Sequence, residues 1–289
     1  MLSNKLIEIG SRSDGTSIVL PFTEISVGEP KVLIAVASAR AGISANLCVW
    51  LLLEKLNKVG VKGSIMILHS IDAEFKHSAT QGEMFYQEIA KKISEIADGC
   101  ELLIQLCCEK NAIPFVLLPQ SRANAKPRLL RIVDSISLGV VDTCSPQDVQ
   151  KDVFIDYALT NKKMCFVLKL SGGSEWASVM SGFAALNNAL VELGIIDSKE
   201  ELPITKKLDQ FSCLKNVICE FSGLLELRVR AGDRVLPNQT LAVVHNYFGE
   251  NIGSVKALQE AIVLSTVTNG MIHQGEKIFE LAVRHPNNT

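Results

Sequence analysis

One stretch near the N-terminus constrains the fold most, because it combines a buried strand, a turn of small residues and a helix. Lys31–Ala37 (KVLIAVA) is almost entirely apolar, which is typical of a strand buried on both faces of a sheet. A turn follows at Ser38–Ser44, and Ala45–Val59 has apolar residues at helical spacing up to Gly60. The next strand, Lys62–Leu68, completes a strand–helix–strand unit, which predicts a parallel sheet.

The rest of the chain extends this pattern into a mixed, largely parallel α/β sheet flanked by helices. A hairpin is predicted around Asp14-Gly15, further buried strands at Leu102–Cys107, within Asn111–Leu118 and at Met164–Leu170, and helices at Glu83–Ala97 and Trp176–Leu193. The stretch that holds Arg122 and Arg131 shows no regular pattern. After the charged segment Asp197–Gln210, short strands punctuated by turn residues predict a small all-β module. We therefore expect an α/β domain over residues 1–205 and a C-terminal β domain over residues 206–289.

Composition narrows the partners and the cellular compartment. The net charge is −2, so the sequence offers no electrostatic case for binding nucleic acid or an anionic membrane. No apolar run is long enough to span a membrane, and the first ten residues lack the apolar core of a signal peptide. Eight cysteines are scattered without CxxC or a spacing typical of disulfides, which favours small buried side chains in a reducing cytoplasm.

Several phrases, in this order and spacing, resemble the succinylglutamate desuccinylase/aspartoacylase family of zinc-carboxypeptidase-like hydrolases. VLIAVASARAG resembles the strand that leads to the family's first metal motif, and EMFYQEIAKKISEIADGCELLIQLCC resembles its helix and the strand that ends in a metal-binding His. CFVLKLSGG resembles the strand that carries the catalytic Glu, and SGLLELRVRAGDRVLPNQTLAVVHNYFGE resembles its C-terminal β domain. The resemblance covers nearly the whole chain. It implies a zinc-carboxypeptidase-like fold and zinc-assisted hydrolysis of an amide.

The residues that this chemistry needs are missing from the matching positions. The family's H-G-[DN]-E motif falls on Ser38–Ser44, and residues Val32 to Leu47 contain no His, Asp, Glu or Cys. The second metal-binding His falls on Cys107, and the general base falls on Lys169, which cannot act as a carboxylate and would repel a cation. The D-L-N-R substrate clamp is not recognisable in Asp72–Ser78. We therefore expect no metal ligand, no zinc cofactor and no catalytic residue.

The resulting hypothesis is a family-like protein that has lost zinc hydrolase activity. It would bind a small acidic ligand or a protein partner, such as another copy of itself or an active homologue, through a degenerate cleft lined by Arg40, Cys107, Cys108 and Lys169. Lys169 and Arg40 would supply the cations for an acidic ligand. A further hypothesis is a structural oligomerisation protein whose cleft is simply filled in. The alternative is an active metal-dependent N-acyl amino acid deacylase with a rearranged site.

Three local features leave alternatives open. His69, Asp72, Glu74 and His77 could rebuild a metal site with Cys107, Cys108 or Glu109, or could form an ordinary solvated loop. Cys107 could be a nucleophile whose thiolate Lys169 stabilises, or a small packing residue. The basic cluster of Arg122, Lys126, Arg128 and Arg131 could contact a carboxylate or phosphate, or could be a solvated face.

Overall fold

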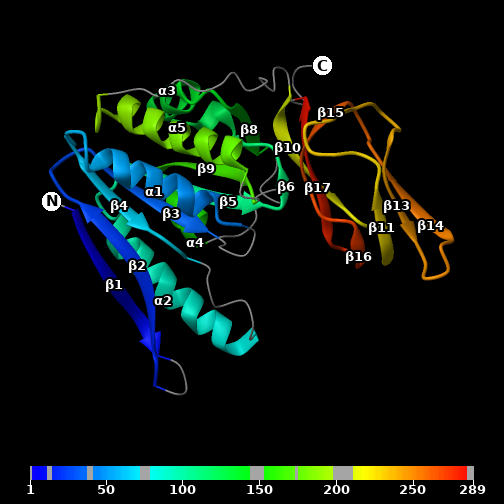
Figure 1. Ribbon diagram of the computed structural model, residues 1–289, viewed down its shortest axis with the longest axis horizontal. Helices are drawn as coiled ribbons and strands as arrows, with labels where there is room; N and C mark the ends of the chain where they lie inside the picture. Colours follow the sequence, from blue (N-terminus) through cyan, green and yellow to red (C-terminus); the bar gives the residue numbers. More distant parts are fainter. Residues whose placement is uncertain are drawn as a thin grey trace.

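A mixed sheet of thirteen strands forms the centre of the protein (Figure 1). The computed structural model describes residues 2–11, 15–37, 42–71, 79–143, 153–172, 175–197 and 211–284. Strands β4 (Ser64–Leu68), β3 (Lys31–Ala37), β5 (Leu102–Glu109) and β9 (Met164–Ser171) lie side by side and run parallel. The parallel sheet expected from the strand–helix–strand unit is therefore confirmed.

Helices cover both faces of these parallel strands. Helices α1 (Ser44–Leu56), α3 (Pro127–Ser135) and α5 (Trp176–Leu193) lie on one face, and α2 (Ala79–Ala97) and α4 (Val153–Thr160) lie on the other (Figure 1). Because side chains alternate along a strand, β3 supplies apolar residues to both cores, which explains its unbroken apolar sequence.

The first sheet edge is the antiparallel hairpin of β1 (Leu2–Ser11) and β2 (Ser17–Ile25), which pairs with β4. This arrangement confirms the hairpin expected in the first thirty residues. The register places Asn4 opposite Thr23 and Leu6 opposite Pro21.

On the other side, the sheet continues without a break into the C-terminal strands. Beyond β9 come β7, β8, β10, β17, β15 and β12, with β6 paired to β15, whereas β14, β13, β11 and β16 form a second, four-stranded sheet. Their bounds are Asn111–Ala112 for β6, Phe115–Leu118 for β7, Gly139–Thr143 for β8, Phe211–Ile218 for β10, Gly223–Leu227 for β11, Arg234–Val235 for β12, Thr240–His245 for β13, Asn251–Lys256 for β14, Ala261–Thr266 for β15, Gly270–Ile272 for β16 and Lys277–Arg284 for β17. Residues 211–284 contain strands and no helix, as the sequence predicts. The division at residues 205 and 206 stays a prediction, because residues 198–210 lie outside the described residues.

Strand β8 and helices α3 and α4 were not predicted. They have five, nine and eight residues, which is too short for a clear period in the sequence. A single 3₁₀ turn, Arg122–Asn124, precedes α3. None of the helices in the described residues is long and apolar enough to cross a membrane.

Most of the cysteines are packed as expected. Six are free, and five of these are buried. Cys213 is disulfide-bonded, which corrects the expectation that no cysteine would form a disulfide. The cytoplasmic location stays a prediction.

Candidate functional site

The carboxyl ends of β3, β5 and β9 meet at one sheet edge, where ligands of parallel α/β sheets usually bind. The register aligns Ala37 of β3 with Cys107 of β5, and Cys107 with Lys169 of β9. The two positions where the resemblance places a metal-binding His and a general base are therefore neighbours in space. In this chain they hold a thiol and an ammonium group.

Lys169 lies among carboxylates instead of facing open solvent. Its Nζ atom donates a hydrogen bond to Glu109 Oε1 at 2.9 Å and lies 3.5 Å from Glu280 Oε1. Glu109 ends β5, and Glu280 lies on β17, so Lys169 joins the parallel strands to the C-terminal strands. Only 9% of the Lys169 side chain and 4% of the Glu280 side chain are exposed.

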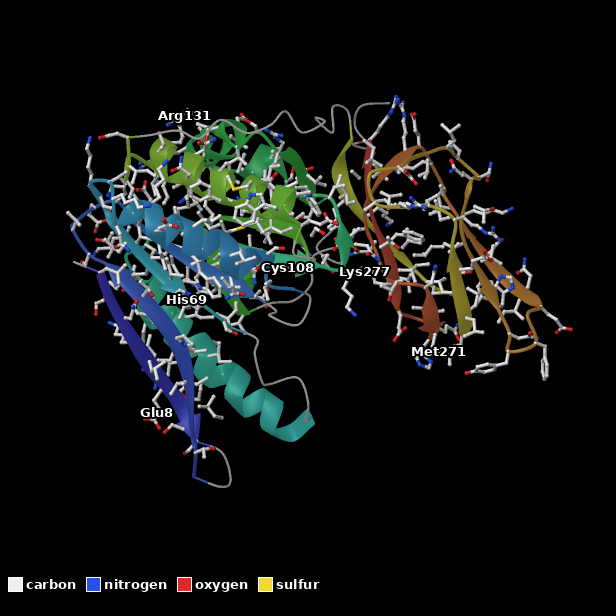
Figure 2. All side chains as sticks on the ribbon, viewed as in Figure 1. Glu8, His69, Cys108, Arg131, Met271 and Lys277 are labelled. Carbon is white, nitrogen blue, oxygen red and sulfur yellow. The ribbon has the colours of Figure 1, made fainter. Side chains whose placement is uncertain are left out.

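Two more residues complete this cluster, which we call the junction network: Lys169, Glu109, Glu280, Lys277 and Ser265. Lys277 donates a hydrogen bond to Glu280 Oε1 at 2.7 Å, and the Ser265 hydroxyl donates to Glu280 Oε2 at 2.9 Å. Figure 2 shows Lys277 between the α/β part and the C-terminal strands. The network thus contains two ammonium groups and two carboxylates and has no net charge.

The pKa values of the two most buried members follow from this pairing. Burial alone lowers the pKa of Lys169, but the attraction of Glu280 and Glu109 outweighs it and raises the pKa above its ordinary value. Burial raises the pKa of Glu280, but Lys169, Lys277 and the Ser265 hydroxyl outweigh it and lower the pKa to about 2. Both groups are charged at neutral pH, so Lys169 cannot accept a proton as a general base.

Cys107 and Cys108 lie on opposite faces of the sheet. Cys107 contacts the apolar residues on the α2 and α4 side and shares its face with Lys169. Cys108 (Figure 2) packs against α1, where its sulfur accepts hydrogen bonds from the backbone of Ala45 and Ser44. Burial nevertheless raises the pKa of the Cys108 thiol, which keeps it protonated at neutral pH. The structure therefore brings Cys107 and Lys169 together and separates Cys108 from them.

The other predicted site residues are either outside the described residues or engaged elsewhere. Arg40 of the expected cleft and Asp72, Glu74 and His77 of the alternative metal site lie outside the described residues. His69, the remaining member of that alternative, directly follows β4, and its Nε2 atom lies 2.7 Å from the Thr23 hydroxyl.

The basic cluster does not converge on the junction network. Arg122 pairs with Asp134 at 2.8 Å, and Arg128 pairs with Glu101. Arg131 lies on α3, away from Lys277 in Figure 2, and is exposed. These placements match the solvated-face interpretation.

Gly42, which follows β3, and Gly172, which follows β9, touch each other near this sheet edge. A Cβ atom on Gly42 would lie 1.4 Å from the carbonyl oxygen of Gly172, so the two backbones are in direct contact and position 42 has no room for a side chain. Gly42 also has a φ of +148°, a conformation that favours glycine. Because β5 lies between β3 and β9 in the sheet, this contact bridges the strand that ends in Glu109.

The described residues at this edge do not fit a zinc ion. Zinc sites use neutral imidazole, thiolate or carboxylate ligands, whereas Lys169 places a positive charge where the resemblance expects a general base. The two nearby carboxylates, on Glu109 and Glu280, already neutralise ammonium groups. Across the part of the chain that the structure describes, no group of three or more His, Cys, Asp and Glu side chains is placed to hold a metal ion.

Comparison with known proteins identifies the fold. No family model matches the sequence, and no curated protein matches it. Among solved structures, an aspartoacylase family protein from Mesorhizobium loti is 16% identical with a TM-score of 0.76, over 98% of this chain and 94% of that one. The ectoine utilization protein EutE from Ruegeria pomeroyi is 16% identical with a TM-score of 0.75, over 98% and 95%. A succinylglutamate desuccinylase/aspartoacylase from Rhodobacter sphaeroides is 12% identical with a TM-score of 0.75, over 100% and 96%.

These likenesses define the class as an α/β protein with a large mixed sheet. More narrowly, the chain has the fold of the succinylglutamate desuccinylase/aspartoacylase proteins over its whole length. The fold expected from the resemblance is therefore confirmed.

Sequence reasoning missed the partners of Lys169. The sequence indicates Glu109 only as a possible metal ligand, and no pattern in it singles out Glu280 or Lys277. A signal was present, because a lysine in the apolar strand Met164–Ser171 needs a nearby carboxylate. Which carboxylate it contacts depends on how β17 packs, and the spacing of residues along the chain does not encode that.

Proposed function

We propose that this protein does not hydrolyse amides with zinc and acts instead as a binding protein built on a hydrolase fold. The observation that carries this proposal is Lys169, a buried ammonium group at the position of the expected general base. A lysine whose pKa is raised by two carboxylates neither activates a water molecule nor tolerates a zinc ion beside it.

The balance of charge in the junction network also indicates which kind of ligand or partner this protein binds. Lys169 and Lys277 are matched by Glu109 and Glu280, so this cluster has no surplus positive charge for an acidic ligand. An acidic ligand would have to displace a buried carboxylate from Lys169 and leave that carboxylate unpaired, which is costly. This charge balance favours a protein partner, such as another copy of the chain or an active homologue, over a small acidic ligand.

Metal content and hydrolysis test the loss of activity directly. The protein should be purified without a metal-affinity tag, analysed for zinc, and assayed on N-acetyl and N-succinyl amino acids with added zinc. We expect zinc far below one ion per chain and no hydrolysis above the buffer rate. About one zinc per chain together with turnover would establish the alternative, a deacylase with a rearranged site.

Two controls make this result interpretable. An active enzyme of the same fold, purified and assayed in parallel, shows that the substrates and the metal are competent. If hydrolysis is seen, Lys169→Met and Cys107→Ala decide whether these residues take part in it.

The preference for a protein partner has its own test. Sedimentation velocity across a range of concentrations should show self-association, or association with an added active homologue. Thermal unfolding with N-acetylaspartate or succinate should show no shift. A saturable rise in the melting temperature with either acid would favour the small-ligand hypothesis.

A further inference from the structure

A groove at the end of the sheet opposite to the C-terminal strands has the features of a second binding site. It lies between the β1–β2 hairpin and α1 and has a volume of about 540 Å³. Sites for small molecules typically measure roughly 300–1,000 Å³ and combine apolar walls with a few convergent polar groups. This groove meets both criteria and shares no lining residue with the junction network.

The base of the groove is a chain of hydrogen bonds centred on Thr23. Its hydroxyl lies 2.7 Å from Asn4 Oδ1 and 2.7 Å from His69 Nε2, and only 3% of the residue is exposed. Asn4 Oδ1 can only accept, so the Thr23 hydroxyl donates to it, and His69 must donate its Nε2 proton to Thr23. Burial lowers the pKa of His69, which favours the neutral ring and makes Nδ1 an acceptor.

The walls of the groove are apolar and accessible. Trp50 on α1 is 56% exposed and Leu6 on β1 is 68% exposed, and Leu53 and Pro21 also line the groove. An exposed indole offers a flat surface on which an aromatic ring can stack. Large apolar side chains gathered around a polar base indicate a site for a molecule that is part apolar and part polar.

The charge at the rim decides the class of ligand. Lys5 is the one cationic side chain in the described lining, because the ring of His69 is neutral. Its Nζ atom pairs with Glu24 at 3.2 Å and lies 4.8 Å from the centre of the Phe22 ring. Because this cation already has a counter-ion, the described lining offers no surplus positive charge to a carboxylate or phosphate.

We propose that this groove binds a small, uncharged, planar molecule that carries a hydrogen-bond acceptor beside a donor, as an aromatic carboxamide does. The ring stacks on Trp50 and contacts Leu53. The ligand carbonyl accepts a hydrogen bond from Asn4 Nδ2, and the ligand N–H donates to His69 Nδ1. The buried Thr23 hydroxyl keeps Asn4 and His69 in the orientation that presents this acceptor–donor pair.

Tryptophan fluorescence gives a direct test, because Trp50 and Trp176 are the only two tryptophans in the sequence. In a Trp176→Phe background, benzamide should change the Trp50 emission in a saturable way. Benzoate, which has the same ring and a negative charge, should bind at least about tenfold more weakly, since its anion would lie against the acceptor nitrogen of His69.

Variants separate specific binding from contact quenching. Asn4→Ala should weaken benzamide binding about three- to tenfold, which corresponds to one lost hydrogen bond. Arg131→Ala, at an exposed position of α3 outside the groove lining, should leave the benzamide affinity unchanged. Calorimetry on the unmodified chain supplies a readout that does not depend on fluorescence.

Two outcomes would overturn the proposal. One is a linear, non-saturating response that is equal for benzamide and benzoate and insensitive to Asn4→Ala. The other is concentration-dependent self-association that Trp50→Ala abolishes without any benzamide binding, which would make this face an interface between copies of the chain.

Discussion

The junction network and the groove at Thr23 both place polar side chains in an otherwise apolar setting, but they do so differently. The junction network pairs four full charges, of which those on Lys169 and Glu280 are buried. The groove buries one hydroxyl and keeps its neutral partners, Asn4 and His69, at an accessible surface. Removing a member of the network should therefore be costly, whereas the groove has polar groups available for a ligand.

The sharpest test of this comparison is Lys169→Met. The substitution leaves the carboxylates of Glu280 and Glu109 with Lys277 as the one remaining ammonium group of the network, so we expect a loss of about 3–5 kcal/mol in the free energy of unfolding. Urea denaturation at pH 7 measures it. The double variant Lys169→Met/Glu280→Gln removes the surplus negative charge that the single substitution leaves in the network, and it should recover part of the loss. A loss below about 1 kcal/mol for the single variant would mean that water reaches the network.

Acid should weaken the junction network in a defined pH range. The pKa of Glu280 is about 2 in the folded protein against 4.5 for the free group, so its contribution is complete above pH 4.5 and is lost as the pH falls towards 2. At 1.36 kcal/mol per pKa unit this contribution is on the order of 3 kcal/mol. Urea denaturation between pH 6 and 3 measures it, and Glu280→Gln should show a shallower decline. Parallel curves for the two proteins would refute the assignment.

A smaller effect is expected from Thr23→Val in the groove. The change removes the central hydroxyl, but Asn4 and His69 can turn to water, so the cost should be about 1 kcal/mol. The same denaturation experiment gives the value. A cost equal to that of Lys169→Met would erase the distinction between the two regions.

The smallest effect concerns His69. Burial lowers the pKa of His69 below 6.5, so the folded protein binds the proton less readily than the unfolded chain does. The contribution of His69 to the free energy of unfolding therefore declines as the pH falls below 6.5. The free energy of unfolding should therefore decrease more steeply between pH 7 and 5 in the wild type than in His69→Gln. This range lies above the one in which Glu280 acts, so the two regions can be titrated separately.

The sequence predicted the elements with a strong pattern and missed what depends on contacts between distant segments. The apolar run Lys31–Ala37 and the long helix Trp176–Leu193 lie where expected, because their periods are clear within one window. The continuation of the sheet from β8 to β10 has no signal in the sequence, since a charged segment followed by short strands with turn residues between them indicates a separate module.

The same limit applied to the candidate site. The identity of Lys169 indicated that the general base was absent, and the register of β5 and β9 placed Cys107 beside it. That the lysine would be neutralised by Glu280 required the packing of β17 against the parallel strands. The separation of Cys107 from Cys108 followed from strand alternation alone and could have been predicted.

The contact between Gly42 and Gly172 also determines how a zinc hydrolase could be engineered from this chain. No side chain fits at position 42, so neither a histidine nor a glutamate can be introduced there by substitution. A metal ligand at this position would need a different backbone path for Gly42 and Gly172, whereas the lysine at 169 can be replaced by substitution alone.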